Sequence, residues 1–173
     1  MRVDHEVLLK LLHYDPNTGV FTWLSSNRGH TLGDVAGSPN GKGYLHISID
    51  RKQYPAQILA WFYVTGTWPC GFVDHKNRIV TDNRWDNLRE ATVKQNSSNR
   101  GLSKQNKSGY KGVREEKNGK FMARITIDGK STHLGTFATA AKAAEAYDSA
   151  ALTHFGEFAL TNKTLRSNHG YEH

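Results

Sequence analysis

The chain has 173 residues, of which 37% are hydrophobic, and so low a hydrophobic fraction favours two small domains over one domain with a large core. Its 23 Lys and Arg against 16 Asp and Glu give a formal net charge of +7, which indicates a polyanionic partner such as nucleic acid, with an acidic membrane surface as the alternative. The short apolar stretches, the lack of a signal-peptide pattern and the single Cys70 predict a cytoplasmic protein with no membrane insertion, internal disulfide or cysteine-rich zinc site.

Hydrophobic periodicity in the first half of the chain predicts short helices and strands. The predicted elements are, in chain order, a helix over 7–12, a turn at 14–19, strands at 20–23 and 43–49, a turn at 50–52 and a helix over 55–65. Gly66 supplies the C-cap signal of the second helix. A further short strand, Phe72-Val73, leads into Asp74 and His75.

The second half has a sharper pattern, in which two Xaa-Gly turns separate three strand-like segments. The segments are 110–114, 120–127 and 131–134. An alanine-rich helix over 140–153, with Thr139 as its N-cap, is expected to cover one face of the resulting antiparallel sheet. Strand alternation then leaves Arg124 on the uncovered face.

A polar stretch from Asn96 to Ser108 separates the two halves. We therefore expect a first domain over 1–100, a linker over 101–107, a second domain over 108–164 and a tail over 165–173. The window from Lys94 to His133 holds ten cations and three anions, and the difference, 10 − 3 = +7, equals the charge of the whole chain. A solvated linker is one interpretation, but the interleaved aromatic residues favour a binding face.

A spaced set of polar residues follows the short strand at Phe72-Val73. Asp74 and His75 are adjacent, Asn87 lies twelve positions after His75, and Asn96 lies nine positions after Asn87. With the Asn-Leu-Arg run at 87–89, this set resembles the HNH endonuclease family, in the branch found among phage and intron-encoded homing nucleases, over residues 14–100. The resemblance implies a ββα-metal fold, in which two strands and a helix hold one divalent metal ion.

These residue types suit phosphodiester hydrolysis, which needs a base to activate water and a cation to hold the phosphate. The ordinary pKa of histidine is about 6.5, so His75 is the expected general base. Asp74 and Asn96 offer the oxygen ligands that Mg²⁺ or Mn²⁺ prefers, with one ion per active site and no small-molecule cofactor. The resemblance gives Asn87 the task of pinning the loop and orienting the strand that carries His75.

Some residues of the motif have plainer interpretations. Asn96 stands where the family name has His, which weakens the case for zinc or nickel. Asp82 and Asp86 are interpreted as ordinary turn and N-cap residues before a helix that starts near Asn87.

The second half resembles the Apetala/ethylene-response-factor DNA-binding domain. The matching motifs are Gly-Tyr-Lys-Gly-Val-Arg at 109–114, Ala-Arg-Ile at 123–125, Leu-Gly-Thr-Phe at 134–137, Ala-Tyr-Asp at 146–148 and the final Asn162. The resemblance implies a sheet that enters the major groove of double-stranded DNA. Arg114 is the expected base contact, Arg124 stands on the exposed face, and Lys111, Lys120 and Lys130 are expected to meet phosphates. A module with merely solvated cations is the alternative.

The sequence thus predicts an α+β protein, with an N-terminal ββα-metal nuclease domain and a C-terminal three-stranded antiparallel sheet packed on one helix. The predicted function is metal-dependent, homing-type nicking or cleavage of double-stranded DNA by a monomer or homodimer, in the host cytoplasm if the chain is phage-encoded. One alternative is a DNA-binding regulator with a degenerate nuclease half, which the complete residue set disfavours. Another is an RNA-binding module, which is disfavoured because the RNA major groove is too narrow for a sheet.

Overall fold

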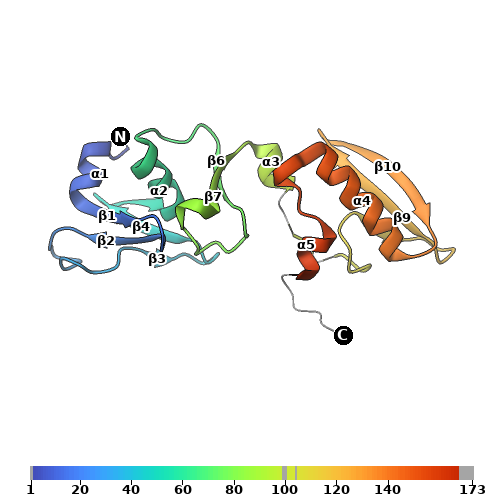
Figure 1. The fold of residues 1–173 in the computed structure, drawn as a ribbon. Helices are drawn as coiled ribbons and strands as arrows, with labels where there is room; N and C mark the ends of the chain where they lie inside the picture. Colours follow the sequence, from blue (N-terminus) through green and yellow to red (C-terminus); the bar gives the residue numbers. More distant parts are fainter. Residues whose placement is uncertain (1, 99–100, 104, 168–173) are drawn as a thin grey trace. The chain divides into compact units, whose positions relative to one another are not determined.

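The protein is a mixed α/β chain, and the computed structural model describes residues 2–98, 101–103 and 105–167 (Figure 1). It forms two compact units, Met1–Val93 and Lys94–His173. The first unit ends before the predicted domain end at residue 100, and the polar stretch that suggested that end contains a helix, α3 (Val93–Ser98). Arg100 and Lys104 of the basic window, and residues 168–173 of the predicted tail, lie outside the described residues. None of the described helices has the length and apolar character needed to cross a bilayer.

The first unit is built from small antiparallel sheets (Figure 1). Its elements are α1 (His5–Leu11), β1 (Leu12–Asp15), β2 (Val20–Trp23), β3 (Ser38–Pro39), β4 (Leu45–Ile49), β5 (Lys52–Pro55), α2 (Ala56–Thr65), β6 (Phe72–His75), the 3-10 helix η1 (Trp85–Asn87) and β7 (Leu88–Ala91). β1 pairs with β2, β3-β4-β5 form one sheet in that order, and β6 pairs with β7.

One hydrophobic core runs through the first unit. Leu8 of α1, Phe21 of β2 and Leu59 of α2 are each 2% exposed or less and belong to it. Val73 of β6 and Leu88 of β7 belong to the same core. The β6–β7 hairpin is therefore anchored in the main core, and the residues at its end are held by that packing.

The structure differs from the predicted elements of this unit at three points. Leu12 begins β1, where it pairs with Trp23, and does not end the first helix. Residues 52–55 form β5 beside β4, a strand that was not predicted, between the expected turn at Asp50 and Arg51 and the expected helix α2. The helix expected near Asn87 is the strand β7, paired with β6. Pairing between strands determines the structure at all three points. The periodicity of a single short segment does not reveal which segments pair.

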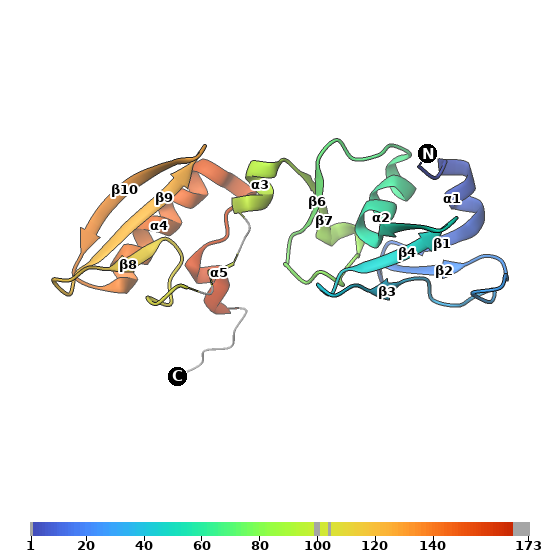
Figure 2. The same cartoon turned by 180° about the vertical axis from the view of Figure 1, so that it is seen from behind.

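The second unit contains a three-stranded antiparallel sheet with a long helix across one face (Figure 1). Its elements after α3 are β8 (Val113–Glu115), β9 (Phe121–Ile127), β10 (Lys130–Phe137), α4 (Ala140–Phe155), the 3-10 helix η2 (Gly156–Phe158) and α5 (Asn162–Ser167), with sheet order β10-β9-β8. Ala143 and Ala144 of α4 pack with Ala123 of β9, and Tyr147 packs with Ile125. Figure 2 shows from behind the sheet face that α4 leaves uncovered.

Asn162, which is 4% exposed, ties the second unit together. Its Oδ1 accepts a hydrogen bond from the Lys111 N–H at 2.6 Å. Its Nδ2 donates to the Lys111 carbonyl at 3.2 Å and to Asp148 Oδ1 at 2.8 Å. The last residue of the predicted C-terminal motif therefore joins the approach to β8, the helix α4 and the start of α5.

Gly19, in the β1–β2 turn, packs directly on the loop between β6 and β7. Its φ of +74° lies in the left-handed region, and a Cβ at this position would overlap the backbone of Asn83 and Arg84. In the same contact the Trp85 N–H donates to the Pro16 carbonyl at 2.9 Å. The β1–β2 turn therefore packs against the loop between β6 and β7 and helps to fix its position.

Gly19→Ala is expected to lower the free energy of unfolding of the first unit by about 3 kcal/mol, because the new Cβ forces two backbone segments apart at a strained φ. Denaturation followed by tryptophan fluorescence measures this, since Trp23, Trp61, Trp68 and Trp85 all lie in this unit. Gly33→Ala is the matched control. Gly33 has φ +89° and none of the described atoms lies within 4 Å of its Cβ position, so a loss of about 1 kcal/mol is expected. Equal losses in the two variants would contradict the packing argument.

Candidate active site

The β6–β7 hairpin carries two of the predicted residues, Asp74 and His75, at the end of β6. The antiparallel register sets Asp74 across from Arg89 and His75 across from Leu88. Because side chains alternate along a strand, His75 points to the same side as the core residue Leu88, and Asp74 points to the opposite side. The strand ends at His75, as the use of both residues in one site requires.

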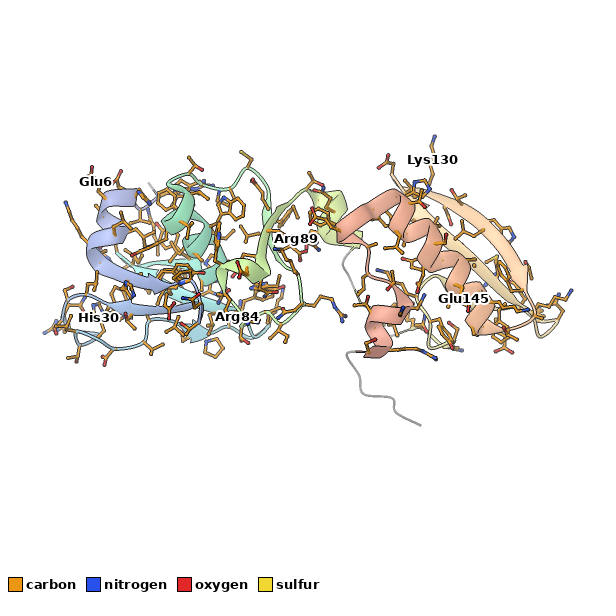
Figure 3. The ribbon with its side chains drawn as sticks, viewed as in Figure 1. Glu6, His30, Arg84, Arg89, Lys130 and Glu145 are labelled. Carbon is orange, nitrogen blue, oxygen red and sulfur yellow. The ribbon has the colours of Figure 1, made fainter. Side chains whose placement is uncertain are left out.

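Asp74 and Arg89 form an ion pair with little access to water. Arg89 donates from Nε at 3.1 Å and from Nη2 at 3.0 Å to the same Asp74 oxygen, Oδ2. Each of the two side chains is 10% exposed. Figure 3 labels Arg89 on β7. Removing one partner would leave a buried charge uncompensated, so the pair holds both side chains in place.

His75 is buried against Asn83, which is 1% exposed. His75 Nε2 and Asn83 Oδ1 are 3.0 Å apart. An amide oxygen only accepts hydrogen bonds, so this contact puts the ring proton on Nε2 and makes Nδ1 the basic nitrogen. The Tyr14 hydroxyl donates to the Asn83 carbonyl at 2.7 Å, and burial raises the pKa of Tyr14 well above its ordinary value, which keeps it a donor. Among the described residues none pairs with Asn83 Nδ2.

Asn87 spans the loop between β6 and β7. Its Nδ2 donates to the Asp82 carbonyl at 2.7 Å, and its Oδ1 accepts from the Asn77 N–H at 3.0 Å. Its own carbonyl accepts from the Lys76 N–H at 2.8 Å. One buried side chain thus ties the beginning of the loop to its end.

Asp82 stiffens the same loop. Its Oδ2 accepts from Asn77 Nδ2 at 2.6 Å and from Arg84 Nη2 at 2.7 Å, and its Oδ1 accepts from Arg84 Nε at 2.8 Å. The hydrogen bonds from Arg84 lower the pKa of Asp82 to about 2. Figure 3 labels Arg84 at this point. Asp82 is therefore an ionised bridge within the loop and caps no helix, since a strand follows Asn87.

The hairpin end fits a hard divalent cation by its donor chemistry. Asp74 offers carboxylate oxygens, the ligand type that Mg²⁺ and Mn²⁺ prefer. The described residues contain no group of three or more His, Cys, Asp and Glu side chains placed to hold a metal ion. An ion at Asp74 would then need amide, water and phosphate oxygens to complete its coordination. It would also compete with Arg89 for Oδ2.

The hairpin and its loop bring together Asp74, His75 and Asn87, while the fourth predicted residue lies elsewhere in the chain. Asn96 is half-buried on α3, beyond the boundary between the two units.

In the second unit, Arg114 and Arg124 are exposed on the sheet face opposite α4. Arg114 lies across from Met122, and Arg124 lies across from His133. The Arg114 guanidinium binds Glu116 Oε1 through Nη2 at 2.8 Å. The three predicted phosphate contacts lie as follows: Lys120 is exposed just before β9, Lys130 is exposed at the start of β10, and Lys111 is half-buried before β8.

A groove of about 810 Å³ lies in the first unit, with a polar lining that includes His30, His46, Arg51 and Gln53. His30 stacks on Trp23, with ring centroids 3.6 Å apart. None of the predicted active-site residues lines this groove, so the reaction is not placed there.

Sequence reasoning missed two residues that touch the site, Asn83 and Arg89. Arg89 belongs to the Asn-Leu-Arg run, and only the assignment of β7 as a strand opposite β6 reveals that it faces Asp74. Asn83 lies eight positions after His75 inside an irregular loop, where no spacing rule predicts a contact.

Comparison with known proteins places the chain in a family. The model of the HNH endonuclease family matches residues 54–98, a range that contains all four predicted active-site residues. An uncharacterized HNH endonuclease of Acanthamoeba polyphaga mimivirus is 36% identical over 148 residues, which cover 86% of this chain and 70% of that protein. Among solved structures, the HNH homing endonuclease I-HmuI is similar, with a TM-score of 0.45 and 20% identity over 100% of this chain and 94% of that one. By its identity to the viral relative, this chain belongs to the HNH endonuclease family and is a nuclease.

Proposed function

We propose that this nuclease is a metal-dependent, homing-type endonuclease that hydrolyses phosphodiester bonds of double-stranded DNA. The observation that carries the proposal is His75 at the end of β6, with its Nε2 held by the buried Asn83 and with Asp74 beside it in the chain. This arrangement orients one basic ring nitrogen and sets an anionic oxygen ligand on the adjacent residue.

In the proposed reaction, Nδ1 of His75 takes a proton from water, because Nε2 is engaged by Asn83. The hydroxide attacks phosphorus, the bond from phosphorus to the 3′ oxygen breaks, and that oxygen takes a proton from solvent. The products are a 5′-phosphate and a 3′-hydroxyl. A bound Mg²⁺ or Mn²⁺, one per active site, supplies charge stabilisation at the scissile phosphate and the departing oxygen. Asp74 and Asn96 are the proposed ligands, and no small-molecule cofactor takes part.

The segment β6, β7 and α3 forms the proposed ββα-metal unit, in which Asn87 is a positioning residue. Its hydrogen bonds to the Asp82 carbonyl and the Asn77 N–H support this role, because they fix the loop that also carries Asn83. A loop fixed in this way keeps the His75 ring in one orientation.

We assign target binding to the second unit, as an Apetala/ethylene-response-factor-type domain whose uncovered sheet face enters the major groove. The exposure of Arg114 and Arg124 on that face supports the assignment. Arg114 has to leave Glu116 to reach a base edge, which costs little because the pair is exposed. The residues proposed to contact phosphates are Lys111, Lys120 and Lys130.

We place the enzyme in a phage-borne mobile element acting in the host cytoplasm, on the strength of the homing-type motif. A monomer has one hydrolytic centre and would nick one strand, whereas a homodimer would have two and could cut both.

His75→Ala is expected to lower the rate of plasmid cleavage by about 10²–10⁴-fold, because it removes the base, while leaving DNA affinity unchanged. Cleavage in Mg²⁺, Mn²⁺ or chelator is compared with binding measured in chelator. If the wild type binds DNA that includes its native locus and cuts none of it, the enzymatic proposal fails and a DNA-binding regulator remains.

Asn83→Asp is expected to move the rising limb of the pH–rate profile to higher pH. A carboxylate beside Nε2 stabilises the protonated ring, so the neutral base forms only at higher pH. Asn17→Asp, which adds the same charge at an exposed turn position, is the control and should leave the profile in place. Equal shifts in both variants, or none in either, would exclude Asn83 as the residue that positions His75.

Arg114→Ala is expected to cost about 1–3 kcal/mol of binding to the preferred sequence and less on other sequences, as a base contact should. Lys130→Ala should weaken binding to all sequences alike and reduce the salt slope by about one. Fluorescence anisotropy at several salt concentrations measures both. The control is Lys142→Ala, on the exposed side of α4, and an equal loss in this variant would rule out the sheet as the binding face.

A further inference from the structure

We infer that Arg89 opposes the loading of a divalent cation at Asp74, so that the protein without DNA binds the metal ion weakly. The inference rests on the proposed function, since it requires Asp74 to be a ligand. It begins from the register of the hairpin, which sets Arg89 directly across from Asp74 on the face opposite His75.

The contact is made to an atom that a metal ion would use. Arg89 Nε and Nη2 lie 3.1 and 3.0 Å from Asp74 Oδ2, so two charge-assisted hydrogen bonds occupy one carboxylate oxygen. With both side chains only 10% exposed, water screens this attraction poorly. A cation that approaches Oδ2 therefore meets a positive group already bound there.

The guanidinium cannot relieve this conflict by losing its proton, because arginine stays charged in proteins. Arg89 lies on β7 directly after Leu88, which is part of the hydrophobic core. The backbone of this strand therefore cannot easily move away from Asp74. A divalent ion at Asp74 thus brings two positive charges next to the guanidinium, which keeps its own positive charge. The expected consequence is a lower affinity for the cation than Asp74 would have alone.

A purely structural ion pair makes the opposite prediction. If Arg89 only holds Asp74 in place, removing it disorders the carboxylate and metal binding weakens or stays the same. If Arg89 is a competing charge, removing it strengthens metal binding even though the hairpin becomes less stable. The sign of the change in affinity separates the two roles.

The test is Mn²⁺ binding to the metal-depleted full chain without DNA, followed by the electron paramagnetic resonance signal of free Mn²⁺. Arg89→Gln and Arg89→Leu, two neutral replacements with different packing, are expected to bind Mn²⁺ about tenfold or more tightly than the wild type. Arg89→Lys keeps the charge and should stay near the wild-type affinity. Arg28→Gln, which removes an exposed positive charge of the same unit, is the matched control and should also stay near it.

Circular dichroism identifies which variants are folded, and a folded Arg89→Lys that binds tenfold more tightly would overturn the inference even if the neutral variants do not fold. Unchanged or weaker Mn²⁺ binding in the folded neutral variants would also overturn it. Asp74→Asn separates this failure from that of the proposed function. If Asp74→Asn loses Mn²⁺ while the Arg89 variants gain nothing, only the inference fails. If Asp74→Asn binds Mn²⁺ as the wild type does, Asp74 is no ligand and both fail.

Discussion

The hydrogen bond between His75 Nε2 and Asn83 Oδ1 is the contact on which the candidate active site depends. Both residues are buried, so a misplaced loop would leave His75 Nε2 and Asn83 Oδ1 without water or each other as a partner. The rest of the first unit serves this geometry. Tyr14 holds the Asn83 carbonyl, Gly19 lets the β1–β2 turn approach the loop, and Asn87 ties the loop ends. These contacts hold the polar loop against the apolar core of the unit.

The pair formed by Asp74 and Arg89 has a different character. Burial of two opposite charges contributes little net stability, because the desolvation cost offsets much of the attraction. The pair instead fixes the orientation of Asp74, on the face of the hairpin opposite His75. One two-stranded hairpin thus carries an imidazole on one side and a carboxylate on the other, on adjacent residues at the end of β6.

The two units carry different sets of polar and charged side chains. The first holds Asp74, His75 and Asn87 in a core-anchored hairpin. The second exposes Arg114 and Arg124 on a sheet whose other face is sealed by α4. Small alanine side chains make that sealing possible, since they let the helix lie close to the strands. The exposed arginines on the sheet face opposite α4 favour a polyanion as its partner.

Local features of the chain were readable from the sequence alone. The αL cap at Gly66 and the N-cap at Thr139 are each encoded within a few residues, where capping and turn chemistry operate. The spacing of Asp74, His75, Asn87 and Asn96 is likewise a property of the linear chain, in which it resembles a known family. Strand alternation likewise set Arg124 apart from the buried residues of β9.

Only the tertiary structure decided which residues face one another. That β7 is a strand, that Arg89 lies across from Asp74, and that Asn83 reaches His75 all depend on pairing between separate segments. The pattern within either segment allows several partners, and the choice among them is made by burial in the common core of the first unit, a property of the whole unit that no short stretch of sequence contains.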